Sequence, residues 1–160
     1  MSFRKPANRA FADRREMTVM AYQITNLCVG CGVCLQICPV SAITGKPKKR
    51  HRIDDAICID CGACGRICPH GSIKTPDGRQ CDRIRIRSRW PKPVFDPALC
   101  MACTICIETC PTGCLGLQPI RGSRDTLRRP RLESEHHCIA CRFCAQECPV
   151  DAIVMSDEAS

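Results

Sequence analysis

The segment CVGCGVCLQICPVSAI, residues 28–43, occurs four times in this chain in closely similar form. The other copies are CIDCGACGRICPHGSI at residues 58–73, CMACTICIETCPTGCL at residues 100–115 and CIACRFCAQECPVDAI at residues 138–153. All four align without gaps as C-x2-C-x2-C-x3-C-P, followed by two residues, a small residue and an aliphatic one. Because a repeated motif governs architecture more strongly than local propensity, the rest of the chain is best interpreted around these four segments.

The cysteine spacing is that of bacterial iron–sulfur proteins. Three thiolates two residues apart can wrap a tight loop around one face of a [4Fe–4S] cubane, and thiolate is the soft ligand that such clusters select. The proline after the fourth cysteine prevents a helix from running back into the loop. Each motif is therefore expected to form a strand, a cluster loop and a short helical turn that opens after the proline, and four motifs predict four [4Fe–4S] clusters.

The composition agrees with a chain organised by a bound group. Only 4% of the 160 residues are aromatic, whereas 18 are cysteines, so a conventional apolar core would be thin. Disulfides would need an oxidising compartment, but no apolar stretch follows the basic N-terminal residues, and the Arg14–Arg15 pair alone is a weak twin-arginine signal. No run of 18 apolar residues is present either. We expect a cytoplasmic protein without a membrane span, whose cysteines bind metal.

Residues 20–75 resemble a bacterial two-[4Fe–4S] ferredoxin over its whole length, and residues 93–155 resemble a second, more diverged copy. The resemblance implies an α+β fold of two tandem ferredoxin-like (βαβ)2 modules, with outer strands at residues 23–24, 73–74 and 153–154. The expected organisation is a basic extension (1–19), a first module (20–76), an arginine-rich linker (77–92), a second module (93–155) and a tail (156–160).

In that family the fourth cysteine of each motif ligates the other cluster of its module. The resemblance thus implies four sets of cysteines that ligate the iron of the clusters. The first cluster would be held by Cys28, Cys31, Cys34 and Cys68, the second by Cys58, Cys61, Cys64 and Cys38, the third by Cys100, Cys103, Cys106 and Cys148, and the fourth by Cys138, Cys141, Cys144 and Cys110. A nested alternative exists in electron-transfer subunits of molybdenum reductases and hydrogenases, where the first motif pairs with the fourth. The gap of only 19 residues between Cys38 and Cys58 favours tandem pairing.

Two cysteines and four histidines lie outside these sets. Cys114 occupies the small-residue position of the third motif and Cys81 lies in the linker, so both are expected to be non-ligands. The histidines are expected at the surface or behind the ligands, and His70 is close enough to Cys68 to adjust a potential by hydrogen bonding. They are His51, His70, His136 and His137.

Charge is divided unevenly along the chain. Residues 1–95 hold 18 Lys or Arg against 7 Asp or Glu, whereas residues 96–160 hold 6 against 9. Four oxidised clusters with sixteen thiolates would add about −8, which brings the formal net charge of +8 near zero and leaves a basic first half and an acidic second half. We expect redox protein partners, at least one of them with an acidic docking surface.

Two basic segments have a local structure of their own. Residues 46–52 form a basic loop or hairpin, and the alternation at residues 83–87 predicts a short strand with an arginine face.

Three classes of function compete. The favoured one is a non-catalytic electron carrier, either a dedicated subunit or partner of an anaerobic oxidoreductase complex or a free polyferredoxin. Radical chemistry would need a C-x3-C-x2-C loop, and Ser41 and Leu117 stand where its third cysteine belongs. A zinc module would leave the third and fourth cysteines and the proline unexplained. Nucleic-acid binding is not expected, because a single Trp and a single Tyr offer few stacking partners.

Overall fold

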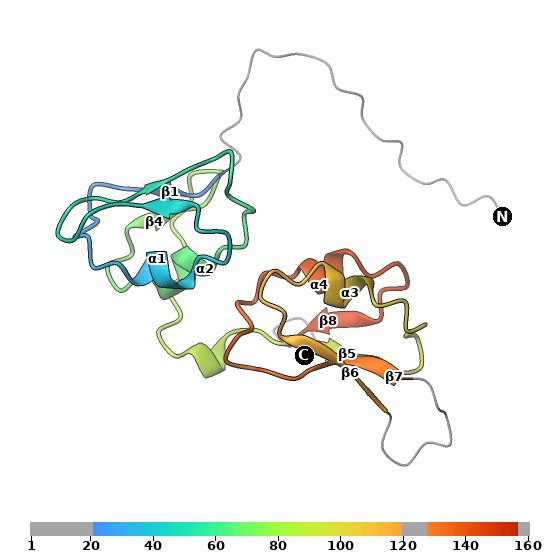
Figure 1. The fold of residues 1–160 in the computed structure, drawn as a ribbon. Helices are drawn as coiled ribbons and strands as arrows, with labels where there is room; N and C mark the ends of the chain where they lie inside the picture. The colour runs from blue at the N-terminus through green and yellow to red at the C-terminus, as the bar shows by residue number, and fades with distance from the viewer. Residues whose placement is uncertain (1–20, 120–127, 157–160) are drawn as a thin grey trace, which may run out of the picture.

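Two units of similar construction follow one another in the computed structural model, which describes residues 21–119 and 128–156 (Figure 1). The first unit contains β1 (Gln23–Ile24), α1 (Val33–Ile37), β2 (Ile43–Thr44), β3 (Arg52–Ile53), α2 (Ala63–Ile67) and β4 (Ile73–Lys74). The second contains β5 (Pro93–Phe95), α3 (Ile105–Glu108), β6 (Leu115–Pro119), β7 (Arg128–Leu132), α4 (Phe143–Gln146) and β8 (Ile153–Met155). A 3-10 helix at Arg87–Arg89 lies between them.

Each unit is built from two antiparallel strand pairs. The outer pair joins the beginning and end of the unit, β1 with β4 and β5 with β8. The inner pair is a hairpin, β2 with β3 and β6 with β7. The strands expected at residues 23–24, 73–74 and 153–154 are therefore confirmed, as is the hairpin around the basic residues 46–52.

The helices do not lie where the motif was expected to place them. Each of the four spans the third cysteine of its motif and ends before the proline, as α1 does between Val33 and Ile37. In the first motif Cys38, which precedes Pro39, is extended with φ −72° and ψ 114°. A residue before proline is pushed out of the helical region, so the proline ends a helix here instead of opening one.

The linker contradicts the expected arginine-faced strand, since residues 83–86 form no strand. Part of it is attached to the first unit, because the N–H of Cys81 donates to the carbonyl of Ile73 (3.2 Å) and the N–H of Ile84 to that of Arg66 (3.1 Å). Strand propensity depends on packing context, and these residues instead lead to Trp90, which is buried.

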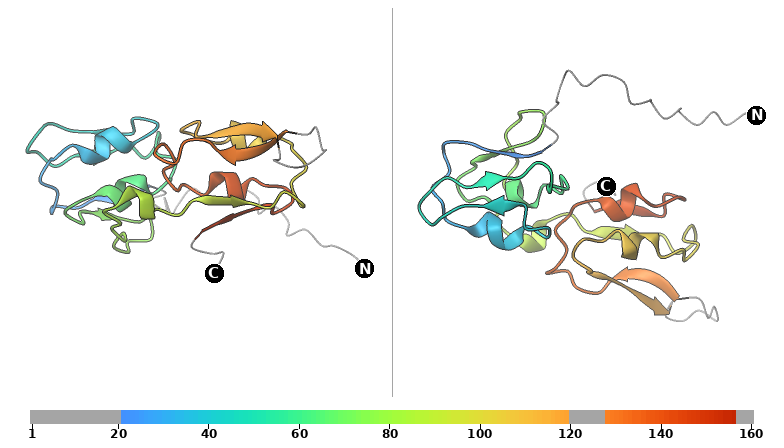
Figure 2. Two further views of the ribbon diagram at one scale, coloured as in Figure 1. Left: turned by 90° about the horizontal axis from the view of Figure 1, so that it is seen from below. Right: turned by 45° about the horizontal axis from the view of Figure 1, so that its top comes forward.

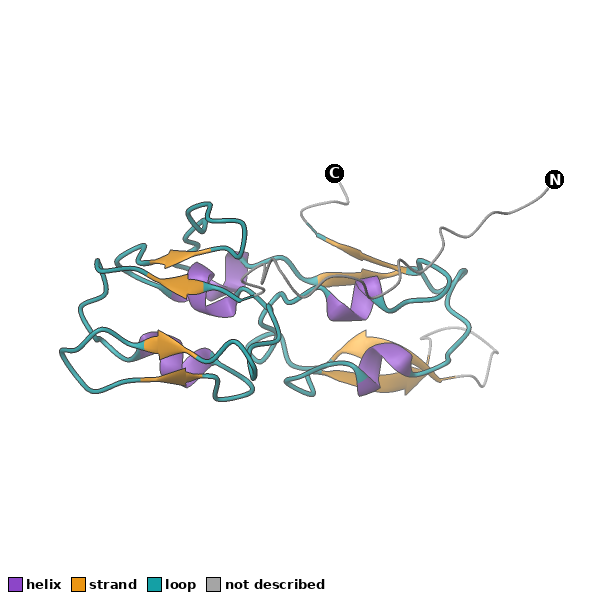
Figure 3. Cartoon of the chain, turned by 90° about the horizontal axis from the view of Figure 1, so that it is seen from above, coloured by secondary structure: helices purple, strands orange, loops and turns teal. Residues whose placement is uncertain are grey.

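Two cores lie within the units and a third lies between them. Cysteines supply much of the first two, with Ile43 and Ile73 in one and Leu115 and Ile153 in the other. The third core joins α2, the linker, the fourth motif and β8 through Ala63, Trp90, Ile139, Ala140 and Met155. It holds the two units side by side (Figure 2), while Figure 3 shows how much of each unit is loop.

Candidate iron–sulfur sites

Twelve of the motif cysteines line three small hollows, two in the first unit and one in the second. One hollow is lined by Cys28, Cys31, Cys34 and Cys68, a second by Cys38, Cys58, Cys61 and Cys64, and a third by Cys110, Cys138, Cys141 and Cys144. They enclose about 290, 330 and 320 Å³ of space free of protein atoms, part of it open to solvent. In each, apart from Cys114 in the third, three cysteines come from one motif and one from the other motif of the same unit.

The remaining motif cysteines also lie together. Burial, with a smaller contribution from the nearby thiolates of Cys100, Cys103 and Cys148, raises the pKa of Cys106 to about 11. The third cysteine of each other motif behaves alike, since burial followed by neighbouring thiolates raises the pKa of Cys34, Cys64 and Cys144 as well. Thiols so placed ionise readily only when a cation compensates the charge.

The loops share a backbone conformation that suits an anion. Positive φ angles recur at the second and fourth residues after the first cysteine and at the third residue after the fourth cysteine. The twelve residues are Gly30, Gly32, Ser41, Asp60, Gly62, Gly71, Ala102, Thr104, Gly113, Ala140, Arg142 and Asp151. Left-handed residues recurring in a loop turn successive N–H groups toward one concave side, which is how backbone nests bind anions. Accordingly the N–H of Asp60 donates to Cys58 and that of Ala140 to Cys138.

The small residue after each fourth cysteine also donates to sulfur. The N–H of Ala42 lies 3.3 Å from Cys38 Sγ, that of Ser72 3.4 Å from Cys68 Sγ and that of Ala152 3.3 Å from Cys148 Sγ. The N–H of Cys114 donates to Cys110 in the same way. A larger side chain at this position would disturb the turn that makes these bonds. The fourth residue after each fourth cysteine, called the small-residue slot below, is therefore small and its N–H donates to the cysteine sulfur.

Ser72 differs from Ala42 and Ala152 by a hydroxyl group that contacts the ligand candidate directly. Ser72 Oγ lies 3.2 Å from Cys68 Sγ, and Ser72 is buried. Burial tends to raise the pKa of Cys68, but the hydroxyl and N–H of Ser72 and the N–H groups of His70 and Gly71 together lower it below its ordinary value. Sequence reasoning recognised the size of this residue but missed its hydroxyl contact.

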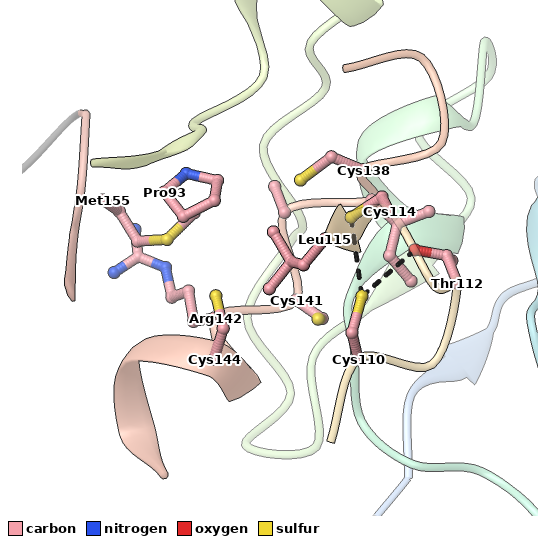
Figure 4. A pocket seen from close by; sticks show the side chains of 12 residues that line it. Pro93, Cys110, Thr112, Cys114, Leu115, Cys138, Cys141, Arg142, Cys144 and Met155 are labelled. Atoms are coloured by element: carbon pink, nitrogen blue, oxygen red, sulfur yellow. Dashed lines mark hydrogen bonds between the residues drawn. The ribbon is translucent and has the colours of Figure 1, made fainter. Parts of the chain in front are cut away.

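Cys114 lines the third hollow as a fifth cysteine (Figure 4). Its Sγ lies 3.5 Å from Cys110 Sγ, and it also forms a hydrogen bond with Cys138. These bonds lower the pKa of Cys110 to about 4 and that of Cys138 to about 6, while the pKa of Cys114 itself is raised. Cys114 Sγ therefore lies within hydrogen-bonding reach of two candidate ligands, Cys110 and Cys138.

His51 lies behind a candidate ligand, which is one of the two positions expected for the histidines. It is 1% exposed, and its Nδ1 lies 3.9 Å from Cys28 Sγ, whereas the exposed His70 lines the same hollow. His137 is exposed and its Nδ1 lies 3.0 Å from Ser134 Oγ. No local signal distinguishes His51 from the other histidines, because its burial depends on the β2–β3 hairpin folding over the first motif.

The donor set fits a [4Fe–4S] cluster. Four thiolates, three on one loop, surround each hollow of comparable size, and convergent N–H groups suit an anionic metal–sulfide core. Within residues 21–119 and 128–156, no group of three or more His, Cys, Asp or Glu side chains is arranged to hold a single metal ion.

Comparison with known proteins agrees with this chemistry. The 4Fe-4S dicluster domain family matches residues 27–72 and again residues 57–114, and a 4Fe-4S binding domain matches residues 134–154. The chain belongs to the 4Fe-4S dicluster domain family. It is therefore an iron–sulfur protein that transfers electrons through [4Fe–4S] clusters. Because the two dicluster matches overlap on the second motif, they do not distinguish which motifs share a cluster.

One relative is a component of an ion-translocating oxidoreductase complex from Azoarcus sp. (strain BH72). It is 40% identical over 53 residues, which are 33% of this chain and 28% of the relative. A solved structure of a formate dehydrogenase–heterodisulfide reductase–formylmethanofuran dehydrogenase complex from Methanospirillum hungatei is similar at 24% identity and a TM-score of 0.33, over 81% of this chain and 52% of the other. The chain thus spans about a quarter and about half of these two proteins.

None of the helices described here is long and apolar enough to cross a membrane.

Proposed function

We propose that this dicluster-family protein holds four [4Fe–4S] clusters and acts as a non-catalytic electron wire within or beside an anaerobic oxidoreductase complex. The observation that carries the proposal is that each hollow gathers three cysteines of one motif and the fourth cysteine of its neighbour. The clusters supply one-electron transfer, and fully cysteine-ligated iron offers no open position for a substrate. The relative that belongs to an oxidoreductase complex supports the role as part of a complex.

We assign the clusters to tandem ligand sets. The first cluster would be held by Cys28, Cys31, Cys34 and Cys68, the second by Cys58, Cys61, Cys64 and Cys38, the third by Cys100, Cys103, Cys106 and Cys148, and the fourth by Cys138, Cys141, Cys144 and Cys110. The tandem sets follow the module boundaries proposed from the sequence, residues 20–76 and 93–155. Crossing ligands tie the two motifs of a module together, so cluster binding and folding would be coupled.

The contact between units supports a spatial order that differs from the chain order. Cys61 and Cys141 both pack against the core between the units, and the Cys141 thiolate raises the pKa of Cys61, after burial and Cys38. One nitrogen, Arg66 Nη1, donates to the carbonyls of both Cys61 and Ile139 at 3.1 Å. We infer that the second and fourth ligand sets face each other, which gives the order first, second, fourth, third along the wire.

Metal analysis of the anaerobically purified protein tests the main proposal. About sixteen irons and sixteen sulfides per chain, with S = 1/2 EPR signals after dithionite reduction, are expected. Zinc with little sulfide would contradict it and would favour a cysteine-rich binding module instead.

Pairs of cysteine substitutions test the wiring. Under tandem pairing Cys38→Ser and Cys61→Ser damage the same cluster, so the double variant retains about twelve irons, as each single variant does. Under nested pairing they damage two different clusters, and the double variant would fall to about eight irons.

A further inference from the structure

We propose that the loop around Cys31, together with the basic connection formed by residues 46–50, is the docking surface for a redox protein with an acidic surface. The proposal rests on the electron-transfer function proposed above and adds the place and chemistry of one partner contact. It starts from the unequal exposure of the sixteen motif cysteines, of which Cys31 and Cys103 are exposed.

Exposure of Cys31 makes the first motif one end of the wire. The corresponding cysteines of the second and fourth motifs, Cys61 and Cys141, pack into the core between the units. Around Cys31 the side chains of Leu27 and Val29 are 61% and 51% exposed. Apolar contacts around an exposed ligand allow a partner to exclude water at the point where an electron leaves the protein.

The basic connection is seated directly on this loop. The N–H of Lys48 donates to the carbonyl of Gly30 (3.2 Å), and a Cβ on Gly30 would lie 2.4 Å from the backbone N and O of Lys49. Figures 1 and 2 show these blue and teal loops at the edge of the first unit that is remote from the second unit. The position of the connection is therefore fixed by backbone packing rather than by its long side chains.

The charge of this edge is of one sign. Lys46, Lys48, Lys49 and Arg50 are all exposed, and none of them forms an ion pair with a described residue. No acidic residue occurs between residues 21 and 53. Four like charges beside an exposed ligand would attract an acidic surface and orient it toward Cys31, because steering of this kind raises association rates about 10- to 1,000-fold.

The opposite end differs in charge. Near Cys103 the exposed side chains of Leu99 and Met101 provide apolar surface, but Glu108 is exposed there and bonded to Thr104 (3.2 Å). Among the described residues, the first motif combines an exposed cysteine with four exposed basic side chains on the segment packed against it, and the third motif does not. We therefore assign the acidic partner to the Cys31 end.

Stopped-flow oxidation of the reduced holo-protein by flavodoxin, used as an acidic one-electron probe, tests the assignment. The variant Lys48→Glu/Lys49→Glu is expected to lower the second-order rate constant about tenfold at low salt and to flatten its salt dependence. The matched control is Arg85→Glu/Arg89→Glu, which makes the same change of charge on exposed linker residues and should alter the rate less than about twofold. Cytochrome c, a basic probe, should react no more slowly with the first variant.

The outcomes separate the docking proposal from the function on which it rests. Iron and sulfide are measured for every variant first, and a wild-type chain with far fewer than about sixteen irons contradicts the four-cluster function whatever the rates. With full clusters, equal slowing by both double variants, or slowing by neither, overturns the docking surface and leaves the function intact. If Lys48→Glu/Lys49→Glu loads poorly, Lys46→Glu/Arg50→Glu changes the same connection by the same charge and decides the question.

Discussion

Replacing Ser72 by alanine should lower the reduction potential of the cluster bound by Cys68. The hydroxyl of Ser72 lies 3.2 Å from Cys68 Sγ in a site where the serine is 2% exposed. Water has little access to take over a hydrogen bond lost there. Reduction adds negative charge to the cluster and its sulfurs, so a donor to sulfur stabilises the reduced state more than the oxidised state.

The size of the effect follows from one hydrogen bond. A bond to a charged group contributes about 1.5–3 kcal/mol, and the part that differs between redox states is on the order of 1 kcal/mol. Since about 1.4 kcal/mol corresponds to 59 mV for one electron, the Ser72→Ala variant should shift one potential downward by about 40 mV. The N–H of residue 72 still donates to Cys68 Sγ in this variant, so the cluster should remain bound.

A reciprocal variant controls for nonspecific effects. Ala42 occupies the same slot, with its N–H 3.3 Å from Cys38 Sγ, and it is equally buried. Ala42→Ser should therefore raise the potential of the cluster that Cys38 ligates by a similar amount. EPR-monitored redox titration and protein-film voltammetry measure both shifts. If both variants keep their potentials within about 10 mV of wild type, a hydroxyl at this position does not set the potential of the cluster.

Three further predictions concern packing and the unused cysteines. Gly32→Ala, at positive φ but meeting only Leu35 at 3.9 Å, should destabilise the holo-protein by the backbone cost of about 1–2 kcal/mol alone. Gly30→Ala should destabilise it further, because its Cβ would also collide with the Lys49 backbone, and anaerobic denaturation compares the two variants. Trp90→Ala should cost about 3–5 kcal/mol and separate the two units in small-angle scattering, while an unchanged radius of gyration would count against the inter-unit core. Cys81→Ala should retain the full iron content, and loss of four irons would make Cys81 a ligand.

The motif predicted that the first three cysteines of each repeat lie on one loop, whereas the position of the fourth came from the resemblance to two-cluster ferredoxins, and the full ligand sets stay a proposal. The sequence also located the outer strands, because short apolar pairs stand at the two ends of the first unit, where β1 pairs with β4. It misplaced the helices, because the proline after Cys38 was taken as a helix start although its effect on the preceding residue ends one.

What the sequence could not reveal depends on contacts between distant segments. His51 is buried only because the β2–β3 hairpin lies over the first motif, and Arg66 donates to the carbonyl of Ile139, 73 positions further along the chain. Residues 83–87 of the linker were expected to form a strand, but they lead instead to buried Trp90, whose ring centroid lies 5.8 and 5.3 Å from the guanidinium carbons of Arg66 and Arg87. Such packing follows from the arrangement of the units, which no local pattern encodes.

The left-handed loop residues connect fold and cofactor. Glycine takes this conformation freely, but Ala102, Thr104, Ala140 and Arg142 adopt it with a side chain, at about 1–2 kcal/mol each. A thin apolar core gives little free energy to offset several such terms. Hydrogen bonds from backbone N–H groups to cysteine sulfur offset part of this cost, and a bound anionic core would strengthen them by holding the cysteines as thiolates. The second unit, whose cluster loops carry no glycine at these four positions, should therefore depend on its clusters for folding at least as strongly as the first.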